Sequence, residues 1–65
     1  MKNNRFKNFN KEELTELFSA LDSNNEYLDN EAVWERRSKN IKGYFKKRYD
    51  INTSLLIELM EALKD

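Results

Sequence analysis

The first regular pattern of hydrophobic and polar positions predicts a helix over residues 10–22. Asn10 is a favourable N-cap residue, and Glu13 stands three positions later, where a capping box needs a glutamate. The polar run Ser23-Asn24-Asn25 favours a break, so we expect the helix to end before it. Apolar residues follow the i, i+3, i+4, i+7 spacing of a half-buried helix: Leu14, Leu17, Phe18 and Leu21.

A second apolar stripe predicts a longer helix over residues 29–49. Its members are expected to build the core, and they keep helical phase along the segment: Trp34, Ile41, Phe45 and Tyr49. Gly43 lies within this helix, where a glycine costs about 1 kcal/mol relative to alanine. A helix ending at Lys42 is therefore the alternative. We favour one continuous helix, because the stripe keeps its phase across Gly43.

A third helix is predicted over residues 52–64, after a second polar break at residues 50–54. Its apolar residues cover more than half of the helix circumference: Leu55, Leu56, Ile57, Leu59, Met60 and Leu63. Such a wide arc either lies between the other two helices or contacts a partner. We therefore take Leu55, Ile57 and Met60 as the candidate oligomer or partner interface.

Together these elements predict an all-α fold. A single three-helix domain occupies residues 10–65, and a short, flexible basic arm precedes it at residues 1–9. A chain of 65 residues buries only about 60% of the surface that its unfolded form exposes. Cysteine and histidine are both absent, which excludes disulfides and a zinc site. We therefore expect a homo-oligomer, most simply a homodimer, to supply the missing stability.

The net charge is zero, but charge is sorted into blocks along the chain. Residues 12–35 contain eight acidic residues and no basic one, whereas residues 36–48 contain seven basic residues and no acidic one. Basic side chains share the outer face of the predicted second helix with a glycine that lets a phosphate approach and a tyrosine that can stack on a base. The candidate nucleic-acid-binding residues are Arg36, Lys39, Lys42, Gly43, Tyr44, Lys46 and Lys47. Such contacts go to phosphates, so we expect salt-dependent binding with little sequence specificity.

Other interpretations of this charge pattern stay open. The basic residues can form the solvated face of an amphipathic helix, or pair with the acidic first helix. The alternative function is a protein–protein interaction module, such as a small inhibitor or adaptor. It would dock through Glu12, Glu13 and Glu16 or through the apolar third helix. The many Asn and Lys residues are typical of a low-GC genome, which fits a regulatory protein of a phage or mobile element.

Catalytic, cofactor and metal sites are not expected. Without His or Cys, general bases and nucleophiles reduce to groups at solvent-type positions, and the chain is too small to enclose a substrate pocket. The stretch "FSALDSNNEYLDNEAV" places Asp22, Asn24 and Glu26 at the alternating positions of a calcium loop. However, Tyr27 occupies the glycine position of that loop and Val33 the position of its bidentate glutamate.

One family resemblance concerns the first half of the chain. "NKEELTELFSALDSNN" followed by "YLDNEAV" resembles the first helix, turn and second-helix start of ribbon-helix-helix repressors, which implies that "NRFKNF" is a DNA-reading strand. Phe6 and Phe9 do not alternate as one buried strand face requires, so the chain is not assigned to that family. No apolar run reaches the length of a signal peptide or membrane span, and we expect a cytoplasmic protein without a membrane partner.

Overall fold

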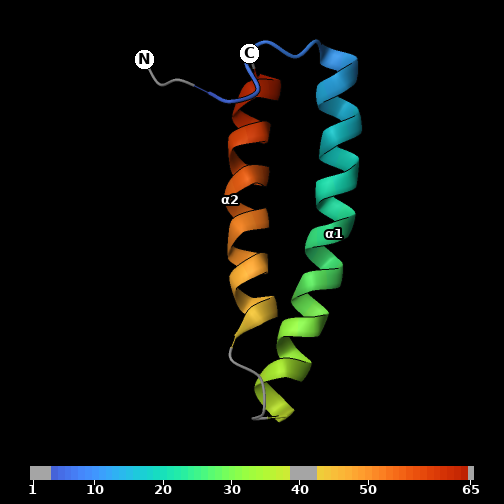
Figure 1. Cartoon of the computed structure of the whole chain (residues 1–65). Coiled ribbons are helices and arrows are strands. Elements are labelled where there is room, and N and C mark those ends of the chain that lie inside the picture. Colours follow the sequence, from blue (N-terminus) through green and yellow to red (C-terminus); the bar gives the residue numbers. More distant parts are fainter. Residues whose placement is uncertain (1–3, 39–42, 65) are drawn as a thin grey trace.

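The computed structural model describes residues 4–38 and 43–64, and the chain forms a hairpin of two antiparallel helices (Figure 1). Helix α1 spans Lys11–Ser38 and helix α2 spans Tyr44–Lys64. The hairpin measures 42 × 23 × 13 Å, so it has two broad faces and is one helix layer thick. All regular secondary structure in the described residues is helical, as expected, but the predicted arrangement of three helices is wrong.

Both predicted breaks lie inside helices. α1 continues through Asn24 and Asn25, and α2 continues through Asn52 and Thr53. The Asn24 amide donates a hydrogen bond to Oδ1 of Asn52 at 3.0 Å, and the Asn25 amide donates one to Oγ1 of Thr53 at 2.9 Å. These polar side chains therefore join the two helices instead of ending them. We call the four residues the asparagine layer.

The real interruption lies next to Gly43, so the predicted continuous helix across this glycine is wrong. Gly43 has a φ of +79°, a conformation that glycine adopts without the strain other residues incur. The Lys47 N–H donates a hydrogen bond to the Gly43 carbonyl at 3.0 Å, which makes Gly43 the residue before the first turn of α2. The alternative helix end at Lys42 and the predicted core residue Ile41 lie outside the described residues.

The apolar core is small. Its buried members in the described part of the chain are Leu14, Leu28, Ala32 and Leu59. The predicted core residues Phe45 and Tyr49 are only partly buried. Trp34 is 63% exposed, so its assignment to the core is wrong. Once the helix is interrupted near Gly43, Trp34 no longer shares a stripe with Phe45. It lies two residues after the buried Ala32, about 200° further around α1.

The start of α1 confirms the predicted capping box. The Asn10 side chain accepts a hydrogen bond from the Glu13 N–H at 2.8 Å, and the Glu13 carboxylate accepts one from the Asn10 N–H at 3.0 Å. Residues 4–9 precede it and lie against α2, where the Asn4 amide donates to the Glu58 carbonyl at 2.8 Å. The flexibility of residues 1–9 stays a prediction, but their described part has partners on α2.

Candidate nucleic-acid interface

The turn end of the hairpin collects basic residues from both helices. Arg36 and Arg37 lie in the last turn of α1. Lys46, Lys47 and Arg48 lie in the first turns of α2, and all five side chains are exposed. The sequence predicts one face of one helix for these charges, whereas the structure brings them together from two helix ends. We call this surface the basic tip.

The predicted binding residues divide into three groups. Arg36, Lys46 and Lys47 belong to the basic tip, while Lys39 and Lys42 lie outside the described residues. Gly43 and Tyr44 stand at the start of α2, at the same end of the hairpin. A Cβ added to Gly43 would meet no atom within 4 Å, so its backbone is not approached closely in the free protein. In the structure, Gly43 serves to adopt the positive φ that precedes the first turn of α2.

Lys46 has an intramolecular partner that a phosphate could replace. Its ammonium group lies 2.8 Å from the Asp50 carboxylate, one helical turn away. Both side chains are more than half exposed, at 55% and 57%. Exposed pairs of this kind contribute only about 0–1 kcal/mol. Exchanging Asp50 for a phosphate oxygen therefore costs little.

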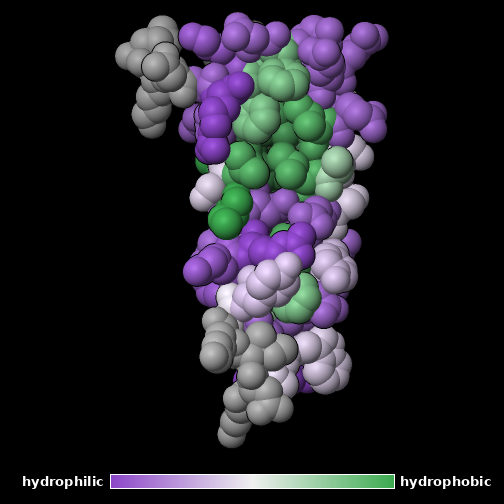
Figure 2. Space-filling view, viewed as in Figure 1, coloured by the Kyte–Doolittle hydropathy of each residue, from purple (hydrophilic) through white to green (hydrophobic). Residues whose placement is uncertain are grey.

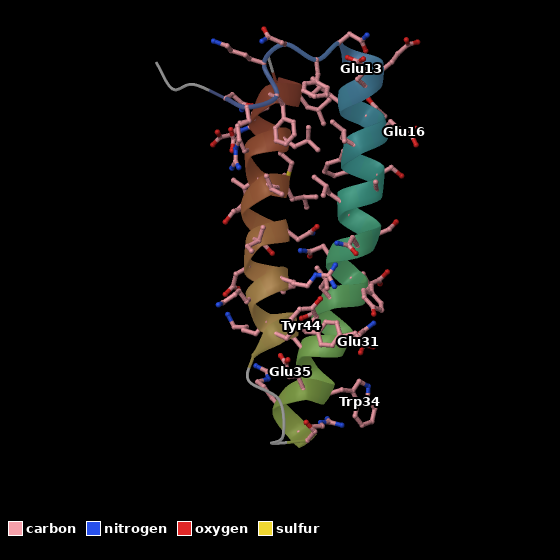
Figure 3. All side chains as sticks on the ribbon, in the orientation of Figure 1. Glu13, Glu16, Glu31, Trp34, Glu35 and Tyr44 are labelled. Atoms are coloured by element: carbon pink, nitrogen blue, oxygen red, sulfur yellow. The ribbon has the colours of Figure 1, made fainter. Side chains whose placement is uncertain are left out.

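Two arginines of the basic tip lie over exposed aromatic rings. The Arg37 guanidinium is 5.5 Å from the centre of the Trp34 ring, and that of Arg48 is 5.6 Å from the Tyr44 ring. Tyr44 is 57% exposed and meets Phe45 edge to face at 5.0 Å. Figure 3 shows Trp34 and Tyr44 at the turn end, one from each helix. Cation–π contacts hold these guanidinium groups close to the helices.

Glu35 closes the helix end beneath the basic tip, a role that sequence reasoning missed. Its side chain is almost completely buried and accepts hydrogen bonds from the Phe45 N–H at 3.0 Å and the Lys46 N–H at 3.1 Å. These are N–H groups that a helix start leaves without intrahelical partners. Because Gly43 has no side chain to cap α2, an acceptor from elsewhere is required. Glu35 fills that place, so a phosphate must bind through the basic side chains.

The three residues of the predicted interface do not form one surface. Ile57 and Met60 are 54% and 47% exposed, and Leu55 is partly buried. Leu55 and Ile57 are two positions apart and therefore point about 200° apart around α2. Ile57 and Met60 share one side of the helix, and Leu55 lies toward the other.

The opposite end of the hairpin carries a separate charge cluster. The Arg5 guanidinium lies 2.6 Å from the Glu58 carboxylate, which also accepts a hydrogen bond from the Arg5 backbone N–H. The hydrogen bond from the guanidinium, followed by that from the backbone, lowers the pKa of Glu58. Nearby, Lys11 and Lys64 line an open pocket of about 390 Å³ together with Phe6 and other residues. These two lysines lie at the opposite end from the basic tip, so they can serve as a control for the charge of Lys46 and Lys47.

Neither described helix contains a stretch that is long and apolar enough to cross a membrane. Comparisons with protein-family models, with curated proteins and with solved structures find no match for this chain. Function is therefore inferred from the basic tip and from the exposed faces of the two helices.

Proposed function

We propose that the protein binds nucleic acid through the basic tip, with Arg36, Lys46 and Lys47 contacting phosphates. The observation that supports this proposal is the convergence of two basic helix ends on one exposed end of the hairpin. A chain of zero net charge has no global field, but a local concentration of cations still attracts a polyanion. Lys39 and Lys42 stand in the sequence between the two helix ends and add to the same positive charge.

The chemistry of the basic tip favours charge recognition over base recognition. Its lysines sit on long flexible stems, and the two stacked arginines are held against rings. Phosphate contacts release bound counterions, so the affinity falls as salt rises and changes little with base sequence. Binding would be electrostatic in origin and rapid in onset.

The test measures the affinity for a labelled duplex by fluorescence anisotropy as a function of salt. Five phosphate contacts, from Arg36, Lys39, Lys42, Lys46 and Lys47, predict a slope of about −4.5 for log K against log salt concentration. Duplexes of unrelated sequence should give similar affinities. An affinity that stays flat between about 50 and about 200 mM salt, or no binding at low salt, would contradict the proposal.

A matched pair of variants locates the contact surface. Lys46→Gln/Lys47→Gln should weaken binding and reduce the magnitude of the salt slope by about 1.8, since each lost contact removes about 0.9. Lys11→Gln/Lys64→Gln removes the same charge at the opposite end and should leave the affinity nearly unchanged. Equal losses from both variants would show that net charge, and not the basic tip, governs binding. Circular dichroism checks that both variants keep their helices.

A second candidate function is protein–protein interaction, and the exposed large apolar side chains favour it. Trp34, Tyr44 and Ile51 are each more than half exposed, at 63%, 57% and 56%. Aromatic residues and arginines are enriched in the cores of protein interfaces. A stoichiometric complex with a protein that survives nuclease treatment and loss of Lys46 and Lys47 would favour this candidate over nucleic-acid binding.

A further inference from the structure

Each helix carries two neighbouring stripes of residues at alternating spacings of three and four, the spacing of a coiled-coil seam. The first stripe of each helix lies between α1 and α2, and it contains the buried residues Leu28, Glu35, Asn52 and Leu59. The second stripe precedes the first by one residue at every position. It therefore lies beside the first stripe, on one broad face of the hairpin. We call this second pair of stripes the front seam.

The front seam runs along both helices. On α1 it consists of Leu17, Ala20, Asn24, Tyr27, Glu31 and Trp34. On α2 it consists of Tyr44, Arg48, Ile51, Leu55, Glu58 and Ala62. None of these side chains is buried within the hairpin. On this face, Figure 2 shows a contiguous hydrophobic area over the half away from the turn and a more polar area toward the turn.

The other flank of each helix does not offer a comparable surface. At the same three–four spacing, the other flank of α1 carries one apolar residue, Val33, among polar and charged ones that include Asp22, Glu26 and Asp29. The corresponding flank of α2 carries Ile57 and Met60 among polar and charged side chains. Large apolar groups follow a seam along both helices only on the front.

We propose that a second copy of this chain covers the front seam, giving a four-helix dimer in which α1 of each protomer packs on α2 of the other. Both turns then lie at the same end. This dimer does not depend on nucleic-acid binding. Like all isologous contacts, it requires the seam to be complementary to itself under a two-fold rotation.

Two different two-fold rotations would bring the front seams of two copies together. The position of each side chain along the helix axis, called its height here, decides between them. The asparagine layer marks one height on both helices. On α1, Leu17 lies seven residues to one side of Asn24 and Glu31 seven residues to the other. A dimer turned end over end about this layer would place Leu17 against the partner's Glu31, and by the same operation Leu55 near the partner's Arg48. Apolar groups would then be buried against charges.

The rotation that keeps both turns at one end gives a better match. In the half away from the turn, Ala20 comes to the height of the partner's Leu55. Leu17 comes to that of the partner's Glu58, whose charge is paired with Arg5 of its own chain. Toward the turn, Trp34 comes close to the height of the partner's Tyr44.

Glu31 lies seven residues from the asparagine layer, between the heights of the partner's Tyr44 and Arg48. Glu31 and Arg48 thus form two symmetric ion pairs across the interface. The two Glu31–Arg48 pairs are the charge complementarity that favours this arrangement.

The size of the front face also suits a second copy. A face of 42 by 23 Å is large enough for the roughly 800 Å² that each partner buries in a standard interface. Among the described residues, the hairpin alone buries only four apolar side chains. A chain of this size without disulfides commonly gains its stability by association. The dimer converts the exposed front seam into a second core layer.

The test exchanges charges between two variants, Glu31→Arg and Arg48→Glu. Each variant alone places like charges across the interface, so its dimer dissociation constant should rise at least tenfold in analytical ultracentrifugation. An equimolar mixture should form a heterodimer with an affinity close to that of the wild type, because both intermolecular pairs are restored while each hairpin keeps its own like-charge pair. Asp29→Arg, an equal charge reversal on the other flank of α1, should leave the dimer intact.

A wild-type measurement complements the variants. Trp34 is the only tryptophan, and its emission should shift to the blue as the protein concentration rises through the dimer dissociation constant. A wild-type protein that stays monomeric overturns the proposal. Single variants that dimerise like the wild type, or a mixture that stays monomeric, overturn this arrangement of the dimer. A wild-type dimer whose Trp34 emission stays unchanged overturns the front seam as its interface.

Discussion

The two helices of the hairpin begin in different ways. α1 starts with a reciprocal cap made within four consecutive residues, in which Asn10 and Glu13 each accept the other's backbone N–H. α2 starts at Gly43, which has no side chain, and takes its cap from Glu35 on the other helix. The first cap forms wherever the local sequence becomes helical. The second exists only when the two helices have packed together.

This difference separates local from tertiary sources of stability. A local cap stabilises one helix end and leaves the rest of the fold unaffected. A cap supplied by a buried carboxylate couples the last turn of α1 to the first turn of α2, and any movement between the helices breaks it. The turn end therefore adds a buried polar contact to its apolar core residues Leu28 and Ala32, whereas the buried side chains described in the opposite half, Leu14 and Leu59, are apolar.

The largest effect should come from removing the tertiary cap. Glu35→Ala leaves the N–H groups of Phe45 and Lys46 without an acceptor and should lower the free energy of unfolding by about 1.5–3 kcal/mol, the range for hydrogen bonds to a charged group. Urea unfolding at fixed protein concentration measures it. Glu26→Ala removes an exposed acid from the same helix and should change stability little. A Glu35 variant as stable as the wild type would remove the distinction between the two caps.

A smaller loss is expected at the local cap. Asn10→Ala removes the acceptor for the Glu13 N–H and should cost about 1 kcal/mol of stability. Asn10→Ser keeps a capping oxygen and should retain most of that stability. Because this cap is local, the loss should appear as fraying at the start of α1 in hydrogen exchange, with no change near Gly43. Faster exchange at the start of α2 would show that the two caps are coupled.

The smallest effect concerns the exposed contact between Arg5 and Glu58. The folded-state pKa of Glu58 lies below its ordinary value because Arg5 donates hydrogen bonds to its carboxylate. Its contribution to stability is therefore present above the ordinary pKa of a glutamate, about 4.3, and is lost as the pH falls through the lowered value. The urea midpoint of the wild type should exceed that of Glu58→Gln at neutral pH, and the difference should vanish in acid. A difference that persists at low pH would assign it to packing.

The sequence predicts what is local in this fold and misses what is not. The capping box of Asn10 and Glu13 is visible in four letters and is confirmed. Asn24 and Asn52 lie in the two predicted helix breaks, because an asparagine favours turns unless its side chain finds a partner. Here that partner is 28 residues away. The phase of the apolar stripe favours a continuous helix across Gly43. That prediction is wrong, and Trp34, a member of the stripe, does not contribute to the core.

Only part of the candidate nucleic-acid interface can be read from the sequence. The run of positive charge from Arg36 to Arg48 is evident in the sequence, and its role in binding stays a prediction. The placement of the basic residues on a single helix face was not correct, since the chain turns between Arg36 and Lys46. The burial of Glu35 follows from that turn, which the apolar stripe does not predict. An acid close before a glycine that opens a helix is the pattern that could have indicated it.

The asparagine layer and the Glu35 cap fasten the two helices at two separate heights. Between them, α1 runs from Asn25 to Glu35, and one inserted residue would rotate one attachment by about 100° and shift it by about 1.5 Å relative to the other. No rotation of the helix could then satisfy both. Natural variants of this protein should therefore keep the length of this stretch fixed even where its exposed residues change, and gain or lose residues only beyond the two attachments.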